Sequence, residues 1–237
     1  MRWVPVSLSS LVAAVACMTA TAATSSTVVP LPTSNVPLPQ GGKATPLRAG
    51  VTYQAKRAFP IVLRLTPPDG SWSGAQWKTS GRGPHSNKPP YFGWVGAVQT
   101  PETPGALPRG AIDLVTSYTR TPSATATVTQ LRTPGHGAAT YGAISHVTIA
   151  GFSGLQFDGT VTGRMHNFVP LSPNSRDPGW YGDSFELGKG AVFRIIVLRV
   201  RTKTVVVFIE PVGLPQDQFP AFLAKADEML KSLRFPR

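Results

Sequence analysis

The stretch that decides the fold is residues 191–210, which read AVFRIIVLRVRTKTVVVFIE. Two runs rich in β-branched residues, 191–200 and 204–209, are joined by the polar residues 201–203. Hydrophobic side chains occupy both alternating sets of positions, a pattern typical of central strands that are covered on both faces. The pattern predicts a β-hairpin in the middle of a sheet.

An amphipathic helix is predicted directly after this hairpin. Its apolar residues follow the spacing of one helical face; they are Phe219, Phe222, Leu223, Ala226, Met229, Leu230 and Leu233. Asp217 is the expected N-cap, and Pro220 falls in the first turn, where its missing N–H is tolerated. We therefore expect this helix to cover one face of the sheet.

Upstream of the hairpin, short hydrophobic runs alternate with loops rich in glycine and proline. Strands are expected at residues 51–53, 61–65, 91–98, 111–118, 144–149 and 155–162, and a short helix at 123–132. Many strands followed by one amphipathic helix indicate an α+β domain with a mainly antiparallel sheet.

Composition excludes several classes of protein. The chain has 237 residues, and its 41% hydrophobic content is enough to build a core, so the chain as a whole is not disordered. A single cysteine excludes a disulfide framework and a cysteine zinc site. With 23 Lys and Arg against 11 Asp and Glu, the formal net charge is +12, which favours anionic partners.

The N-terminus is typical of exported proteins. Residues 1–22 combine one arginine, a short apolar run and an Ala-x-Ala site, which predicts a secretory signal peptide. Cys17 allows two interpretations: it is lipidated and becomes the mature N-terminus, or it is removed with the signal peptide. Residues 23–46, rich in Pro, Ser and Thr, are predicted to be a flexible linker, and residues 47–237 a single globular domain. No segment is long enough to predict a transmembrane span.

Two groups of residues are candidates for binding. Arg194, Arg199, Arg201 and Lys203 place positive charge on the predicted hairpin, which suits phospholipid headgroups, an anionic cell-wall polymer or an envelope protein. Trp72, Trp77 and Trp94 are expected either to pack in the core or to contact a ligand at the surface. Export and the lack of a nucleic-acid-binding motif argue against nucleic acid as a partner.

The sequence assigns no catalytic residue, no metal site and no cofactor. The stretch 151–155, GFSGL, lacks the last glycine of the G-x-S-x-G motif of serine hydrolases. No two histidines have the spacing of a metal-binding pair on a predicted element. An envelope hydrolase acting on glycan or ester substrates is the alternative, with Ser153, His146 and Asp158 as its candidate residues.

The C-terminal half resembles a known group of proteins. Gly151, Gly154 and Asp158, the hairpin FRIIVLRVRTKTVVVFIE and the helix ending in LKSLRF are similar to actinobacterial secreted proteins and lipoproteins of the LpqN-like, PsbP-like α/β-sandwich type. The resemblance covers residues 140–235 and implies a curved antiparallel sheet with flanking helices. It further implies a binding or accessory module of the cell envelope, secreted or lipid-anchored and without catalytic activity.

Overall fold

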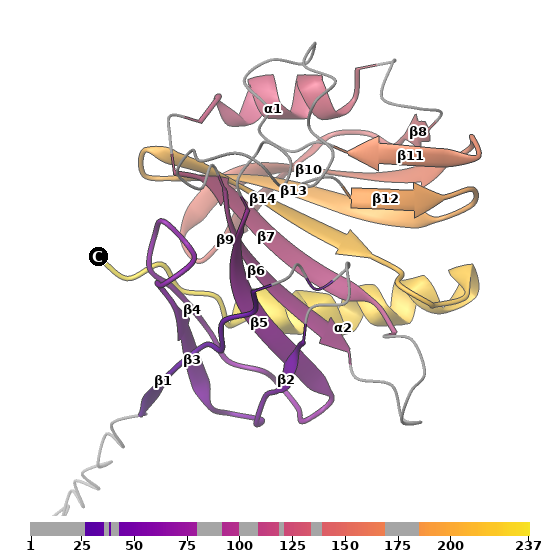
Figure 1. Ribbon diagram of the computed structural model, residues 1–237. Helices are drawn as coiled ribbons and strands as arrows, with labels where there is room; N and C mark the ends of the chain where they lie inside the picture. The colour runs from indigo at the N-terminus through magenta and orange to yellow at the C-terminus, as the bar shows by residue number, and fades with distance from the viewer. Residues whose placement is uncertain are drawn as a thin grey trace, which may run out of the picture.

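The computed structural model shows a large sheet with helices on both sides (Figure 1). It describes residues 27–35, 38, 43–79, 92–99, 109–118, 121–133, 139–168 and 185–237. The predicted signal peptide and Cys17 lie outside these ranges. None of the described helices is long and apolar enough to cross a membrane.

The described chain is built mainly from strands. They are β1 (Val28–Pro30), β2 (Thr45–Pro46), β3 (Thr52–Ala55), β4 (Leu63–Leu65), β5 (Trp72–Thr79), β6 (Phe92–Gln99), β7 (Ala111–Ser117), β8 (Ala139–Tyr141), β9 (Ser145–Ile149), β10 (Phe152–Val161), β11 (Met165–Phe168), β12 (Phe185–Gly188), β13 (Val192–Val200) and β14 (Lys203–Glu210). The helices are α1 (Ala124–Leu131), the 3-10 turn η2 (Gln216–Gln218) and α2 (Phe219–Lys231).

The predicted hairpin forms the centre of the sheet. Nine strands make up this sheet in the order β2-β5-β6-β7-β14-β13-β10-β8, and β9 also pairs with β10. Each neighbouring pair is antiparallel, as expected. β13 and β14 are joined by a two-residue turn in which Arg201 has a φ of 56°. The predicted α+β class and the mainly antiparallel sheet are confirmed.

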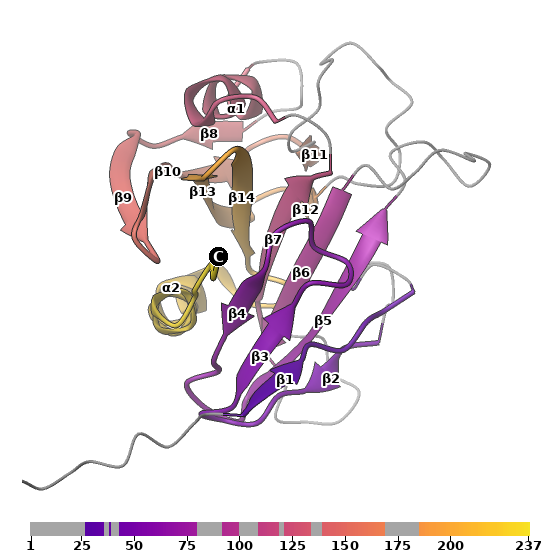
Figure 2. The ribbon, with the colours of Figure 1, turned by 90° about the vertical axis from the view of Figure 1, so that its left-hand side faces the viewer.

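Each face of the large sheet packs against a separate layer. On one face lie α2 and a small sheet of order β1-β3-β4, which bury residues such as Leu31, Phe222 and Leu198 together. On the other face lies α1, whose Val128 packs with Phe193. Figure 2 shows α1 and α2 on different sides of the sheet. Side chains on both faces of β13 and β14 are therefore buried. This agrees with the hydrophobic residues at both alternating sets of positions in the hairpin sequence.

The C-terminal helix packs as predicted but starts differently. Phe219, Phe222, Ala226, Met229 and Leu230 are its buried residues. The N-cap position is taken by Gln218, not by Asp217, because residues 216–218 form the short turn η2 before the helix. The prediction of an Asp217 cap was therefore wrong, since spacing alone does not show an additional helical turn.

Part of the segment predicted to be a linker takes part in the fold. β1 pairs in parallel with β3, and β2 pairs with β5. Leu31 is only 1% exposed and belongs to the hydrophobic core beside Gly74 of β5. Strands of two or three residues are too short to show periodicity, so composition alone suggested flexibility.

Candidate functional site

The four basic residues predicted on the hairpin point in different directions. Arg194 lies on the α2 face, where its Nε is 2.7 Å from a carboxylate oxygen of Asp158. The Asp158 carboxylate raises the pKa of Arg194. Arg199 lies on the opposite face, and the Lys203 ammonium donates to the carbonyl of Tyr118 over 3.0 Å. These four residues therefore do not form one continuous binding surface.

Arg201 instead contacts the C-terminal segment beside a pair of arginines from distant parts of the chain. Its Nη2 donates to the carbonyl of Phe235 over 2.8 Å. The neighbouring Arg234 pairs with Arg64 of β4, and the amide of each donates to the carbonyl of the other over 2.9 and 2.8 Å. We call Arg64, Arg201 and Arg234 the arginine cluster.

Like charges directly opposite each other in an antiparallel pair are destabilising. Arg64 and Arg234 nevertheless occupy such a pair, with their neighbours Leu63 and Leu233 buried. Their guanidinium groups donate to the Gln54 side chain and to backbone carbonyls of residues 231 and 233. Within the described ranges, no carboxylate lies within ion-pair distance of the cluster. The cluster therefore concentrates positive charge that a bound anion would neutralise.

The three predicted tryptophans lie in the core. Trp72 is fully buried, and its ring centroid is 6.1 Å from that of Phe222 in α2. Trp77 and Trp94 stack with their centroids 5.8 Å apart on the other face. Of the two roles considered for these residues, their burial supports core packing.

Two buried carboxyl groups lie on neighbouring strands of the α1 face. Asp113 of β7 is opposite Phe208 of β14, and Glu210 is opposite Ala111, so the two acids are diagonal neighbours. Asp113 is 1% exposed and Glu210 5%. Neither carboxyl oxygen of Asp113 has a hydrogen-bond donor from the described part of the chain. Gly96 faces Asp113, and a Cβ atom at Gly96 would lie 2.7 Å from Oδ1.

Burial favours the protonated form of both carboxyl groups. It raises the pKa of Asp113 well above its ordinary value of 3.8, and repulsion from Glu210 adds to the effect. Burial likewise raises the pKa of Glu210 to about 7. A raised carboxyl pKa means that the folded chain keeps a proton that the unfolded chain has already lost. The pair therefore carries less negative charge near neutral pH than two exposed carboxylates would, and it opposes folding as the pH rises.

Replacing Asp113 by asparagine is expected to flatten the pH dependence of stability. In the wild-type protein, each retained proton lowers the free energy of unfolding by about 1.4 kcal/mol per pH unit. For Glu210 this loss runs from pH 4.5 to about 7, and for Asp113 it begins near 3.8. Urea denaturation at a series of pH values measures it. Replacement of the exposed Asp217 by asparagine is the control. If the free energy of unfolding changes equally with pH in both variants, the prediction is contradicted.

The candidate residues of a hydrolase are divided between the two faces. His146 of β9 is opposite Leu155, so it shares the α1 face with Ser153. Asp158 lies on the α2 face, where Arg194 holds its carboxylate with two hydrogen bonds of 2.7 and 3.0 Å. The sheet therefore separates Asp158 from the other two residues. No cluster of three His, Cys, Asp or Glu residues suited to a metal ion occurs among the described residues.

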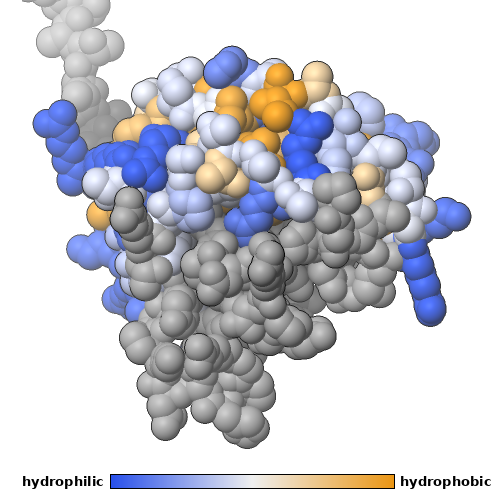
Figure 3. Space-filling view, turned by 90° about the horizontal axis from the view of Figure 1, so that it is seen from above, coloured by the Kyte–Doolittle hydropathy of each residue, from blue (hydrophilic) through white to orange (hydrophobic). Residues whose placement is uncertain are grey.

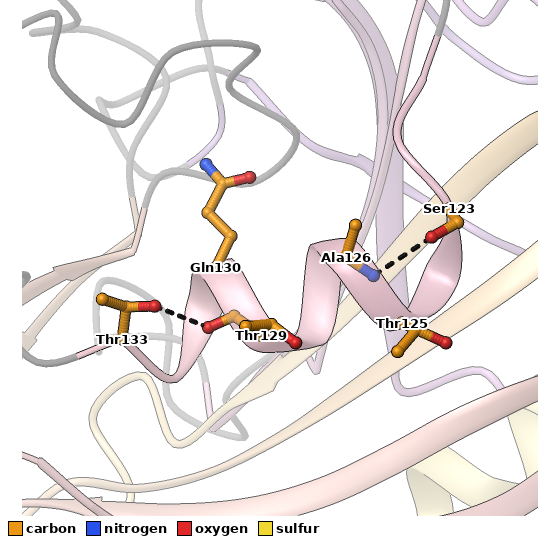
Figure 4. A pocket seen from close by; sticks show the side chains of 6 residues that line it. All are labelled: Ser123, Thr125, Ala126, Thr129, Gln130 and Thr133. Atoms are coloured by element: carbon orange, nitrogen blue, oxygen red, sulfur yellow. Dashed lines mark hydrogen bonds between the residues drawn. The ribbon is translucent and has the colours of Figure 1, made fainter.

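A shallow hollow of about 480 Å³ lies over the outer face of α1 (Figure 4). Its lining consists of Ser123, Thr125, Ala126, Thr129, Gln130 and Thr133. Two of the hydroxyl groups are used by the helix itself: Ser123 Oγ caps the Ala126 amide, and Thr133 Oγ1 donates to the Thr129 carbonyl. Seen from the side of α1, hydrophobic side chains form a small group among hydrophilic ones (Figure 3). The uncharged lining makes this hollow a poorer candidate for an anionic partner than the arginine cluster.

Comparisons with known proteins show a weak similarity at the level of the fold. No family model matches the sequence, and no curated protein matches it. Among solved structures, the chain is similar to LpqN of Mycobacterium tuberculosis, described as involved in cell envelope biogenesis. The two are 14% identical, the match covers 78% of this chain and 91% of LpqN, and the TM-score is 0.37.

Sequence reasoning missed Arg64, Arg234 and Asp113. Arg64 and Arg234 are far apart in the sequence and meet only through the bridge between them. Asp113 had a visible signal, because it interrupts the predicted strand AIDLVTSY with an acid between apolar residues. A charged residue inside a buried strand is rare and marks a position of interest.

Proposed function

We propose that this protein is an extracytoplasmic module of the cell envelope that binds an anionic component without catalysing a reaction. The observation that supports it most directly is the arginine cluster, where Arg64 and Arg234 lie opposite each other without a described carboxylate partner. The predicted signal peptide and the net charge of +12 agree with a role outside the membrane among anionic lipids and polymers.

Arginine suits such a partner because its planar guanidinium binds phosphate or carboxylate groups through paired hydrogen bonds. The three side chains of the cluster come from β4, the β13–β14 turn and the C-terminal segment. Their backbones are joined through residues 234 and 235, so the folded domain fixes the spacing of the charges. We propose that the arginine cluster, and not the hairpin as a whole, is the binding surface.

Replacing Arg64 and Arg234 together by glutamine is expected to weaken binding to vesicles that contain phosphatidylglycerol. Each arginine near an anionic surface contributes about 1 kcal/mol, so the double variant should bind about thirtyfold more weakly. Vesicle co-sedimentation at low and high salt measures this, and phosphatidylcholine vesicles provide the neutral reference. Binding of the wild-type protein should fall as salt rises.

A double variant with the same loss of charge provides the control. Lys43 and Lys189 are exposed and lie outside the cluster, so replacing both by glutamine should weaken binding much less. If both double variants lose binding equally, total charge and not the cluster attracts the vesicles. Salt-insensitive binding of the wild-type protein, or none to any anionic vesicle or to polyphosphate, would contradict the proposed function.

A further inference from the structure

The two outer edges of the large sheet differ in how they are protected from pairing. At one edge, β2 has only two residues, one of them Pro46, and Lys43 and Arg48 lie on either side of it. Short strands, proline and cations are the usual means by which proteins prevent another strand from adding to an edge. This edge is therefore protected.

At the opposite edge, β8 and β9 lie one after the other along β10. β8 pairs with Gly159–Val161, and β9 pairs with Phe152–Gln156. Figure 2 shows β9 as the outermost strand on its side of the molecule. Within the described part of the chain, neither strand pairs with anything on its other side. An unpaired strand edge presents free backbone N–H and C=O groups.

At this second edge β8 is itself short, with three residues, but β9 has neither proline nor a charged residue. No Asp, Glu, Lys or Arg occurs between Arg132 and Asp158, although the chain carries a net charge of +12. The residues of β9, Ser145–Ile149, have no proline, and β-branched residues favour the extended conformation. Just before β9, Ile144 is 48% exposed and is the large hydrophobic residue most accessible to solvent among those described.

The absence of charge indicates which partner fits. Two copies of a protein with a net charge of +12 repel each other, and this repulsion is weakest where their uncharged segments meet. Two cations flank β9 and do not lie within it: Arg132 stacks over Tyr141, at the junction between β8 and β9, and Arg201 is bonded to Phe235, which packs on Phe152 opposite the last residue of β9.

We propose that β9 pairs with β9 of a second copy, so that two large sheets join into one continuous sheet. A two-fold axis makes such a contact self-complementary, because the same edge serves both copies. This inference goes beyond the proposed function and has the opposite salt dependence. Salt screens repulsion between the two basic copies, so pairing should strengthen as salt rises, whereas binding to anionic vesicles should weaken.

Sedimentation equilibrium of the purified protein over a range of concentrations tests the pairing. We expect the mass to rise from that of one chain to twice this value. Hydrogen exchange should show concentration-dependent protection of the amides of residues 144–149 and of no equally exposed segment. Replacing the exposed Thr148 by lysine places like charges at the contact, which should raise the dimer dissociation constant at least about tenfold.

Thr45 of β2 is also exposed, and its replacement by lysine is the matched control at the opposite edge. The T45K variant should dimerise like the wild type once the added charge is screened by salt. A wild-type protein that stays monomeric at every concentration would overturn the proposal, even if the edge accepts a strand of another protein. Two other results would also overturn it. One is an equal loss of dimer in T45K and T148K, and the other is concentration-dependent protection from hydrogen exchange that occurs only outside residues 144–149.

Discussion

Replacement of Phe193 by alanine is expected to lower the free energy of unfolding by about 4 kcal/mol, in the range found when buried phenylalanines are truncated. Phe193 is fully buried on the α1 face of β13. Its ring stacks on Phe208 at a centroid distance of 5.9 Å and meets the edge of Tyr141 at 6.3 Å. Urea denaturation with linear extrapolation measures the change.

Gly159 explains why the loss should be large. Gly159 is opposite Phe193 in the register, and a Cβ atom at this glycine would lie 2.3 Å from the ring. The ring therefore occupies the space above a residue without a side chain, and alanine at position 193 would leave a cavity that no neighbour fills. Cavities of this kind add to the loss of buried apolar surface.

The control for this variant is Thr125→Ala, because the Thr125 side chain is exposed on the outer face of α1. A surface substitution of this kind should change stability by less than about 0.5 kcal/mol. A loss of less than about 1 kcal/mol in the Phe193 variant, below the range for buried aromatic residues, would mean that the α1 face is loosely packed.

Replacement of Leu31 by alanine is expected to lower the free energy of unfolding by about 3 kcal/mol. Leu31 directly follows β1 and is buried, with its side chain next to Gly74 of β5. Its amide donates to the Gln54 carbonyl over 2.8 Å, and its carbonyl accepts from the Gln76 side chain over 2.6 Å. These bonds hold the N-terminal segment against β3 and β5, so the loss of the side chain should weaken both contacts.

Thr33, two residues later, provides a control within the same segment. Its side chain is exposed, so its replacement by alanine should have little effect on stability. If both variants unfold like the wild type, residues 23–46 behave as the flexible linker that their composition suggested. A loss confined to the Leu31 variant would show that the folded unit includes this segment in solution.

The sequence predicted the elements whose pattern is long and regular. The hairpin β13–β14 and the helix α2 extend over enough residues for their periodicity to be unambiguous. The short helix α1 was predicted because Ser123 follows a proline, and Ser123 does cap it. Elements of two to four residues, such as β1 and β2, carry no such signal, and their pairing depends on strands far away in the chain.

The candidate site was less predictable than the fold. Basic residues of the hairpin were identified by their closeness in sequence, but in a strand neighbouring side chains point to opposite faces. Arg194 and Arg199 accordingly lie on different sides of the sheet. Arg201 joins Arg64 and Arg234 only because the C-terminal segment returns to pair with β4.

The sequence by itself determined that this chain makes an α+β domain around a central hairpin, because hydrophobic periodicity is a local property of the chain. It also determined the net positive charge of the chain and the lack of Asp, Glu, Lys and Arg between Arg132 and Asp158. Only the tertiary structure decided that two arginines face each other and that Asp113 and Glu210 share a buried face. It also decided that the uncharged segment forms an edge to which no other described strand is added. These three features depend on which strands become neighbours, and strand order is set by packing of the whole domain and not by local pattern.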